Sequence, residues 1–252
     1  MKLVCGDLKI PYSDISSLPD DLTVEGDLIM NATRVTRLPK GLRVKGTLDI
    51  GCTKIREIPE DIEVGGDLIA INCMGITRFP KGLDIKGGLN LSGTKITTLP
   101  DYLEVGGNLS WSNNEKIKKL PKGLKVKGNL DISGTSITEI PDDVEIGGGL
   151  YMRSCHILRL PRKMVIHGTC DFTRSYIAEF PEDLEVEGSL YLQRTHGFGK
   201  LPQRLRVTDC LYSEYCSFTG ELPADMILGK AYSPTEDCLI PTTDEMVIRI
   251  PA

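Results

Sequence analysis

The chain has 252 residues, of which 40% are apolar, and a formal net charge of −5. This is enough apolar material for one or two globular domains with a core. No run of about 18 apolar residues occurs, and residues 1–30 lack a basic start followed by an apolar stretch, so we expect neither a membrane span nor a secretory signal, and a cytoplasmic protein. The 30 basic and 35 acidic residues are interspersed, which argues against nucleic acid as a partner.

Glycine and proline are unusually frequent, with 26 and 15 residues, whereas aromatic residues make up 6% of the chain. This composition indicates that turns recur at regular intervals. The eight cysteines contain no Cys-x-x-Cys pair, so we expect reduced thiols and no disulfide framework or metal site.

An apolar residue followed by proline recurs every 20 or 21 residues. The prolines of these pairs are Pro19, Pro39, Pro59, Pro80, Pro100, Pro121, Pro141, Pro161, Pro181, Pro202 and Pro223. A fixed period of this length is typical of repeat architectures, in which each repeat forms one structural unit.

Each unit begins at the proline and continues as an alternating segment. Residues 124–132 alternate apolar residues or glycine with polar residues, which predicts an extended segment with one buried face. Gly128 interrupts this face and predicts a corner between two short strands, where the chain bends or another backbone approaches closely. The Leu-Pro segment predicts the return turn, because proline cannot donate to a continuing strand. One unit is therefore one coil.

A single coil cannot bury its apolar residues, so the coils must stack. We predict a β-solenoid of about eleven parallel coils with little helix over residues 1–228, on the order of 50–60 Å long because strands lie about 4.8 Å apart. Residues 229–252 lose the repeat pattern, and we expect an irregular C-terminal cap there.

Two segments, Leu89–Pro100 and Leu130–Pro141, share the pattern Leu-x-(Leu/Ile)-Ser-Gly-Thr-x-Ile-x-x-(Leu/Ile)-Pro. This pattern resembles the short leucine-rich repeats of bacterial type III secreted effectors and similar arrays in phage and prophage proteins. The resemblance implies a solenoid that binds other proteins. Where that family has an Asn ladder, this chain has Thr33, Thr53, Cys73, Thr94, Thr135, Cys155, Ser175, Thr195 and Cys216. The repeat starts in register at Val4, and no ligase domain follows it, so an effector is the second hypothesis.

Few residues suggest chemistry. His156 and His196 lie two coils apart, too far to share a metal, and Cys155 and His156 should point to opposite faces because they are adjacent in an extended segment. Asp131 and Asp171 occupy the outward strand position two coils apart, about 10 Å by strand spacing, a separation that fits an inverting glycosidase; we expect a solvated acidic pair instead. No catalytic residue, metal or cofactor is therefore expected.

The outward residue at the centre of the main strand changes along the array. It reads Lys9, Ile29, Asp49, Ile69, Asn90, Ser110, Asp131, Tyr151, Asp171, Tyr191 and Tyr212. Tyrosine and arginine are enriched at binding hot spots, although tyrosine is also a good strand former. The candidate binding residues are Tyr151, Arg153, Asp171, Tyr191 and Tyr212, with Ile29 and Ile69 as a weaker second patch.

These observations favour a non-enzymatic solenoid of phage or bacterial origin that binds a protein partner along its strand face, since solenoids present extended surfaces. One alternative is a translocated effector that acts in a host cell. Another is a β-helix carbohydrate-active protein that uses Asp131 and Asp171.

Overall fold

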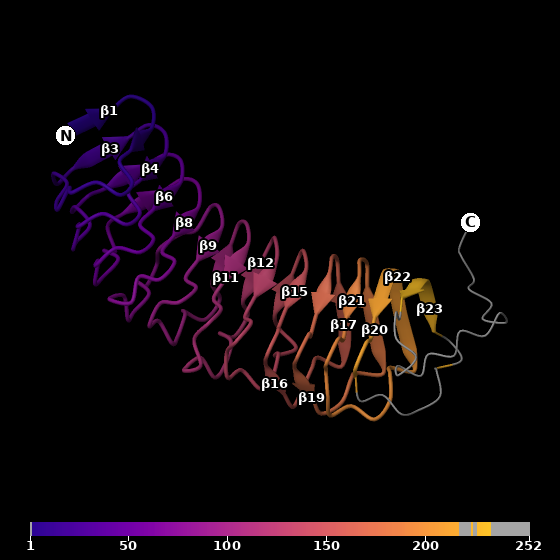
Figure 1. Ribbon diagram of the computed structural model, residues 1–252. Coiled ribbons are helices and arrows are strands. Elements are labelled where there is room, and N and C mark those ends of the chain that lie inside the picture. Colours follow the sequence, from indigo (N-terminus) through magenta and orange to yellow (C-terminus); the bar gives the residue numbers. More distant parts are fainter. Residues whose placement is uncertain (1, 217–222, 224–225, 233–252) are drawn as a thin grey trace.

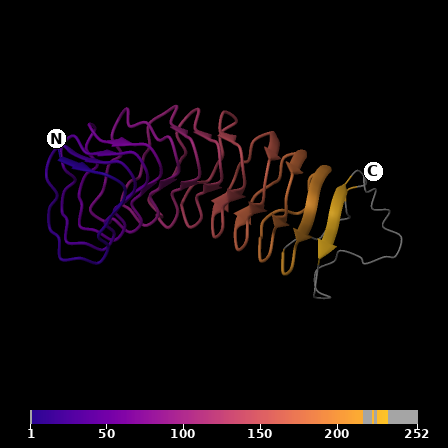
Figure 2. The ribbon, with the colours of Figure 1, turned by 90° about the horizontal axis from the view of Figure 1, so that it is seen from above.

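The computed structural model describes residues 2–216, 223 and 226–232. The chain forms a parallel β-solenoid of about eleven turns, and no helix occurs within the described residues. Figures 1 and 2 show the coils stacked side by side in chain order as a gently curved rod. The predicted fold class is confirmed.

Most coils contribute two short strands, as the alternating pattern predicts. The first strands are β1 (Lys2–Val4), β3 (Leu22–Val24), β5 (Arg43–Val44), β7 (Glu63–Val64), β10 (Glu104–Val105), β12 (Lys125–Val126), β14 (Glu145–Ile146), β17 (Lys163–Ile166) and β20 (Asp183–Val186). The main strands are β2 (Leu8–Lys9), β4 (Leu28–Ile29), β6 (Leu48–Asp49), β8 (Leu68–Ile69), β9 (Leu89–Asn90), β11 (Leu109–Ser110), β13 (Leu130–Asp131), β15 (Leu150–Tyr151), β18 (Cys170–Asp171) and β21 (Leu190–Tyr191). Equivalent strands pair in parallel one repeat apart, as in Leu109 with Leu130.

Glycine at the corner between the two strands is required by close stacking. A Cβ atom added to Gly66 would lie 2.7 Å from the carbonyl carbon of Gly46 and 2.9 Å from the amide nitrogen of Thr47 in the preceding coil. Both atoms belong to the backbone, so neither can move aside as a flexible side chain would. The expectation that another backbone approaches closely at this position is confirmed.

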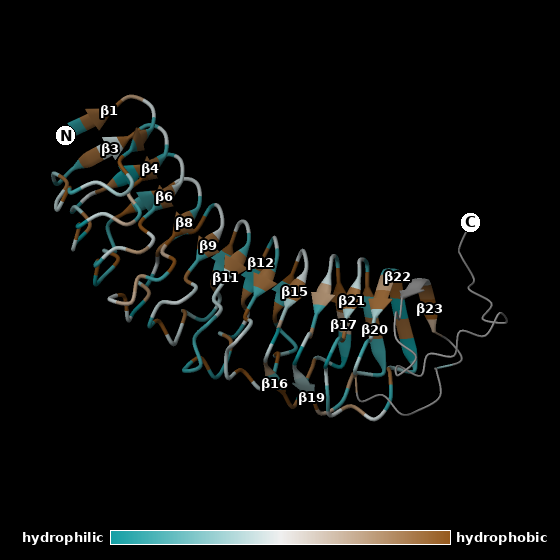
Figure 3. Cartoon of the chain, viewed as in Figure 1, coloured by the Kyte–Doolittle hydropathy of each residue, from teal (hydrophilic) through white to brown (hydrophobic). Residues whose placement is uncertain are grey.

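The inward residues of successive coils form one continuous apolar core. Leu28, Leu48, Leu68 and Leu130 have no exposed surface, and the single tryptophan, Trp111, is equally buried. Figure 3 shows the resulting alternation of hydrophobic and hydrophilic residues along the strands. Because each coil buries its leucine only against the neighbouring coils, stability comes from stacking.

Hydrogen bonds to side-chain amides and carboxylates link the corners of neighbouring coils. The residue after the corner glycine accepts a hydrogen bond through Oδ1 from a backbone N–H of the next coil. The donor and acceptor pairs are Asp27 to Asp7 (2.9 Å), Thr47 to Asp27 (2.8 Å), Gly88 to Asp67 (2.6 Å), Asn129 to Asn108 (2.8 Å) and Gly149 to Asn129 (2.7 Å). These bonds satisfy N–H groups where the chain turns and the strand ladder is interrupted.

A second set of hydrogen bonds lies inside the coils at the Thr, Cys and Ser positions. Thr53 Oγ1 donates to the carbonyl of Ile50 (2.8 Å), and Thr195 Oγ1 donates to that of Phe172 in the preceding coil (2.7 Å). These hydroxyls therefore hydrogen-bond buried carbonyls, and a buried carbonyl without a hydrogen bond would destabilise the fold.

The coils change shape near residue 145. The first strands β10, β12 and β14 form a sheet of their own, whereas β17 and β20 join the 14-stranded main sheet through β22 (Arg204–Tyr212), and within the described residues β14 does not pair with β17. A third strand also appears in two coils, as β16 (His156–Ile157) and β19 (Tyr176–Ile177). The C-terminal coils are therefore a second type of repeat.

Strand β23 (Ile227–Tyr232) pairs in parallel with β22, and Tyr212 is in register with Tyr232. The strand arrangement thus extends past residue 228 into the segment for which an irregular cap was expected. Residues 233–252 of that predicted cap lie outside the described residues. No helix in the described part of the chain is long and apolar enough to cross a membrane.

Three aspartates on the solenoid surface have pKa values below the ordinary value because they accept hydrogen bonds. The chief donors are the Lys9 ammonium for Asp7, the Lys40 backbone N–H for Asp20 and the Arg204 guanidinium for Asp183. A carboxyl group with a lowered pKa in the folded state contributes stability above its unfolded pKa and loses it as the pH falls through the folded pKa.

We therefore expect the urea midpoint to stay constant from about pH 7 to pH 5 and to fall below about pH 4. Trp111 fluorescence is a suitable probe because this residue is the only tryptophan and is fully buried. The Asp20→Asn variant should lose less stability on acidification than the original protein. A midpoint that rises on acidification would contradict this assignment.

Candidate binding surface on the main strands

The predicted binding residues lie on adjacent strands of the main sheet. Tyr151 is in register with Asp171, Asp171 with Tyr191, and Tyr191 with Tyr212. Their side chains point away from the core because the inward position beside each is taken by Leu150, Cys170, Leu190 or Leu211. The structure thus brings these four candidates together in one column.

Tyrosine and arginine concentrate in the C-terminal coils in three neighbouring columns of this face, from Tyr151 and Arg153 in two of them and from Arg174, one coil later, in the third. The first is the central outward column, where Ser110 and Asp131 are followed by Tyr151, Asp171, Tyr191 and Tyr212; its early coils carry Lys9, Ile29 and Ile69. In the second, two residues later, the order is Asn31, Gly51, Ile71, Ser92, Ser112, Ser133, then Arg153, Thr173 and Gln193. In the third, one residue further, it is Tyr12, Ala32, Cys52, Asn72, Gly93, Asn113, Gly134, Ser154, then Arg174, Arg194 and Tyr215. We call the residues of these three columns from Tyr151 onward the C-terminal face.

The third column has left-handed backbone geometry in every coil. Its φ angles include 60° at Arg174, 57° at Arg194 and 56° at Tyr215. Glycine is the residue that adopts this conformation at least cost, and the chain has glycine there at Gly93 and Gly134. Arginine at such a position is therefore not explained by backbone preference. The sequence pattern does not reveal the left-handed conformation of this column, because only two of its residues are glycine.

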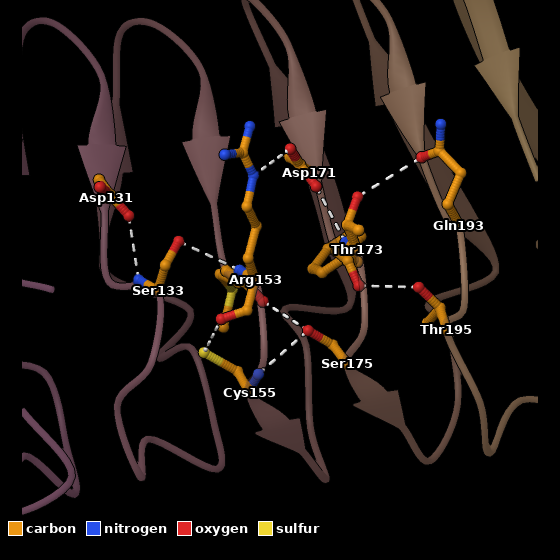
Figure 4. A network of polar contacts seen from close by, with 11 residues as sticks. Asp131, Ser133, Arg153, Cys155, Asp171, Thr173, Ser175, Gln193 and Thr195 are labelled. Carbon is orange, nitrogen blue, oxygen red and sulfur yellow. Dashed lines mark hydrogen bonds and ion pairs between the residues drawn. The ribbon is translucent and has the colours of Figure 1, made fainter. Parts of the chain in front are cut away.

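Asp171 is buried, in contrast to the prediction of a solvated carboxylate. Its exposed fraction is 3%, because Tyr151 and Tyr191 flank it and Arg153 covers it. Arg153 Nε donates to Asp171 Oδ2 at 2.5 Å, and Asp171 Oδ1 accepts the Thr173 N–H at 2.9 Å (Figure 4). Asp171 therefore positions Arg153 and has no free surface for a partner. The ion pair raises the pKa of Arg153.

Polar contacts extend from this ion pair over four consecutive coils, as Figure 4 shows. The Arg153 N–H donates to Ser133 Oγ at 3.2 Å, and Thr173 Oγ1 donates to Gln193 Oε1 at 3.4 Å. These bonds restrict the side chains before any partner arrives, which lowers the entropy cost of binding.

The aspartate and asparagine side chains of the central column share one structural role in alternate coils. Each Oδ1 accepts the backbone N–H two residues later and closes the end of its strand. The acceptors and donors are Asp49 with Gly51 (2.9 Å), Asn90 with Ser92 (3.1 Å), Asp131 with Ser133 (3.0 Å) and Asp171 with Thr173 (2.9 Å). Asp131 and Asp171 therefore have a local structural explanation, which weakens the glycosidase hypothesis.

The aromatic residues of the C-terminal face are ordered by contacts with their neighbours. Tyr191 and Tyr212 stack with ring centroids 4.5 Å apart and an interplanar angle of 9°. The Cys210 side chain raises the pKa of Tyr212 to about 12, so its hydroxyl stays protonated at neutral pH. Arg153 lies over the Tyr151 ring at 5.9 Å from its centroid. Such rigid aromatic groups are efficient anchors for a partner.

A shallow groove of about 550 Å³ runs across this face. Its walls include Arg153, Tyr191 and Gln193, with Arg174 and Arg194 along one side. Arg194 also lies over the ring of Tyr215, 5.9 Å from its centroid. The groove is therefore lined by three guanidinium groups, an aromatic ring, one amide and the hydroxyls of Ser154 and Thr173, with the carboxylate of Asp171 covered by Arg153.

Cys155 and His156 point to opposite faces of the coil, as the alternating pattern predicts. Cys155 is buried, donates to the Ile132 carbonyl at 3.4 Å and has a pKa raised by burial. His156 is exposed on the opposite side and stacks on Tyr176 at 4.4 Å, so the two residues cannot act as nucleophile and base. Within the described part of the chain, no group of three or more His, Cys, Asp or Glu side chains is placed to hold a metal ion.

Comparisons with protein-family models, with curated protein sequences and with solved structures returned no match. The class of protein is therefore defined by its own structure, as a parallel β-solenoid of about 20-residue coils with leucine at the repeat positions.

Proposed function

We propose that this protein is a non-enzymatic solenoid that binds a protein partner along the C-terminal face of its main strands. The observation that supports this most is the concentration of tyrosine and arginine in three adjacent columns of the C-terminal coils. Good strand propensity explains tyrosine on one strand position, but it does not explain arginine in the two neighbouring columns.

The chemistry of the face also fits protein binding. Tyrosine and arginine supply most binding energy at protein interfaces, and here both are held in place by stacking and by the buried Asp171. The regular coils from Val4 to Ile132 then serve as a rigid support that extends the sheet. A shallow, open groove suits a macromolecule better than a small substrate, which usually requires a deep pocket.

Origin and location rest on the repeat resemblance. We propose a phage or bacterial protein that works in a cytoplasm, with the translocated effector as the alternative. The same face would bind the partner in either case, so a secretion assay on the first 20 residues separates the two. The carbohydrate-active alternative is less supported, because Asp171 is covered by Arg153.

The test is affinity capture from the cells that make the protein. The Tyr191→Ala/Tyr212→Ala variant should bind its partner at least about fivefold more weakly, which corresponds to a loss of about 1–2 kcal/mol or more. Its far-ultraviolet circular dichroism should be unchanged, because both side chains point outward.

Two controls accompany this experiment. Tyr102→Ala removes a tyrosine that is 75% exposed but lies on the turn side, and Lys127→Ala removes an exposed charge at a corner. Both should bind normally. Normal capture by the double tyrosine variant, together with loss of capture by Lys127→Ala, would place the binding surface at the corners and refute the proposal.

A further inference from the structure

Resting on the proposed function, we infer that the partner presents an acidic segment in extended conformation, whose carboxylates bind Arg174 and Arg194 across the ends of β18 and β21. The inference names the chemistry of the partner and a pair of arginines in the groove that form no ion pair within the described residues.

Arg174 and Arg194 are exposed and occupy equivalent positions in neighbouring coils. Their backbone N–H groups donate to the carbonyls of Gln193 and Glu214, which keeps the two residues one strand spacing apart. Within the described residues neither guanidinium forms an ion pair, whereas Arg153 in the same groove is paired with Asp171. Two arginines in one groove are therefore available to acidic groups.

The spacing of these arginines suits an extended peptide. Neighbouring coils lie about 4.8 Å apart, and side chains at positions i and i+2 of an extended chain lie about 6.6–6.8 Å apart on one face. The long arginine side chains can span this difference. Each guanidinium matches a carboxylate through two parallel N–H donors. The expected motif is therefore an acidic residue, any residue, and a second acidic residue, running along the solenoid axis.

The structure favours a peptide over other anionic chains. Single-stranded nucleic acids stack their bases on open aromatic faces, but Tyr191 and Tyr212 cover one face of each other. The net charge of −5 also repels a polymer that carries a charge on every unit. A segment with two or three carboxylates opposite a local cationic patch avoids most of this repulsion, since screening limits charge interactions to about 8–10 Å.

The probe is a fluorescein-labelled peptide, Gly-Ser-Glu-Thr-Glu-Thr-Glu-Gly-Ser, and its counterpart with glutamine at every glutamate. Fluorescence anisotropy at low salt should show binding of the acidic peptide at least about tenfold tighter than of the glutamine peptide. The Arg174→Ala/Arg194→Ala variant should lose this preference.

The matched control is Arg56→Ala/Arg78→Ala, which removes two exposed arginines of neighbouring coils on the turn side and gives the same net charge. This control should bind the acidic peptide normally. Equal binding of the two peptides, equal losses in the two double variants, or tighter binding of oligothymidylate or polygalacturonate than of the acidic peptide would overturn the inference.

Partner capture separates this inference from the proposed function. If Arg174→Ala/Arg194→Ala captures the partner normally while Tyr191→Ala/Tyr212→Ala does not, the acidic segment is refuted and the binding face stands. If neither double variant reduces capture, the binding face itself is refuted.

Discussion

Replacement of Leu130 by alanine should lower the free energy of unfolding by about 2–5 kcal/mol. Leu130 has no exposed surface and is in register with Leu109 on one side and Leu150 on the other. Truncation removes apolar contacts and leaves a cavity that rigid coils on both sides cannot fill. The neighbouring coils should loosen first, because each coil is supported only by the next.

Urea denaturation measures this loss, and hydrogen exchange locates it. Lys127→Ala in the same coil is the control, because Lys127 is exposed, and it should change stability by about 0.5 kcal/mol or less. If the two variants were equally stable, the alternation of inward and outward residues would be displaced by one residue.

Replacement of Gly66 by alanine should destabilise the solenoid by about 1–3 kcal/mol through overpacking. The added Cβ would lie 2.7 Å from the backbone of Gly46, so two coils would have to separate at the corner. Gly199→Ala is the matched control, because a Cβ there has no atom within 4 Å. This variant should be neutral or slightly stabilised. Equal destabilisation of both variants would contradict close stacking of the corners.

The coil, its two strands and the outward position of the candidate binding residues were predictable because they depend on local patterns. Alternation with a period of two defines the buried face, the glycine marks the corner, and the proline ends the strand. These signals recur in nearly every repeat, β22 being a coil without the corner glycine, so an error in one coil is corrected by the others. The outward column of Tyr151, Tyr191 and Tyr212 follows from the same alternation.

Features that depend on contacts between coils were not predictable. Asp171 has the same sequence position as Asp131, but only Asp171 is covered, because Arg153 of the preceding coil folds over it. The alternating pattern predicts on which face of the sheet a residue lies, but it does not predict which rotamer a neighbouring side chain adopts. The left-handed positions of Arg174 and Arg194 were hidden for a similar reason, since coil stacking imposes this conformation on residues that do not prefer it.

The change of coil type after β14 also has only a weak sequence signal. The turns after Pro39, Pro80 and Pro121 contain the left-handed residues Gly41, Gly82 and Gly123, whereas those after Pro59, Pro141, Pro161 and Pro181 contain none. The later coils form four-residue strands, β17 and β20, at this place. The absence of a turn glycine does not by itself predict these longer strands, because the coils after Pro59 and Pro141 also lack one and form the two-residue strands β7 and β14.

The most direct test of the central claim is site-specific photo-crosslinking in the cells that make the protein. A photoreactive phenylalanine analogue is placed at Tyr191, at Tyr212 or, as a control, at the exposed Tyr102 on the turn side. The account predicts a covalent adduct with one protein partner from positions 191 and 212 and none from position 102. An adduct from position 102 without one from positions 191 and 212 would contradict it.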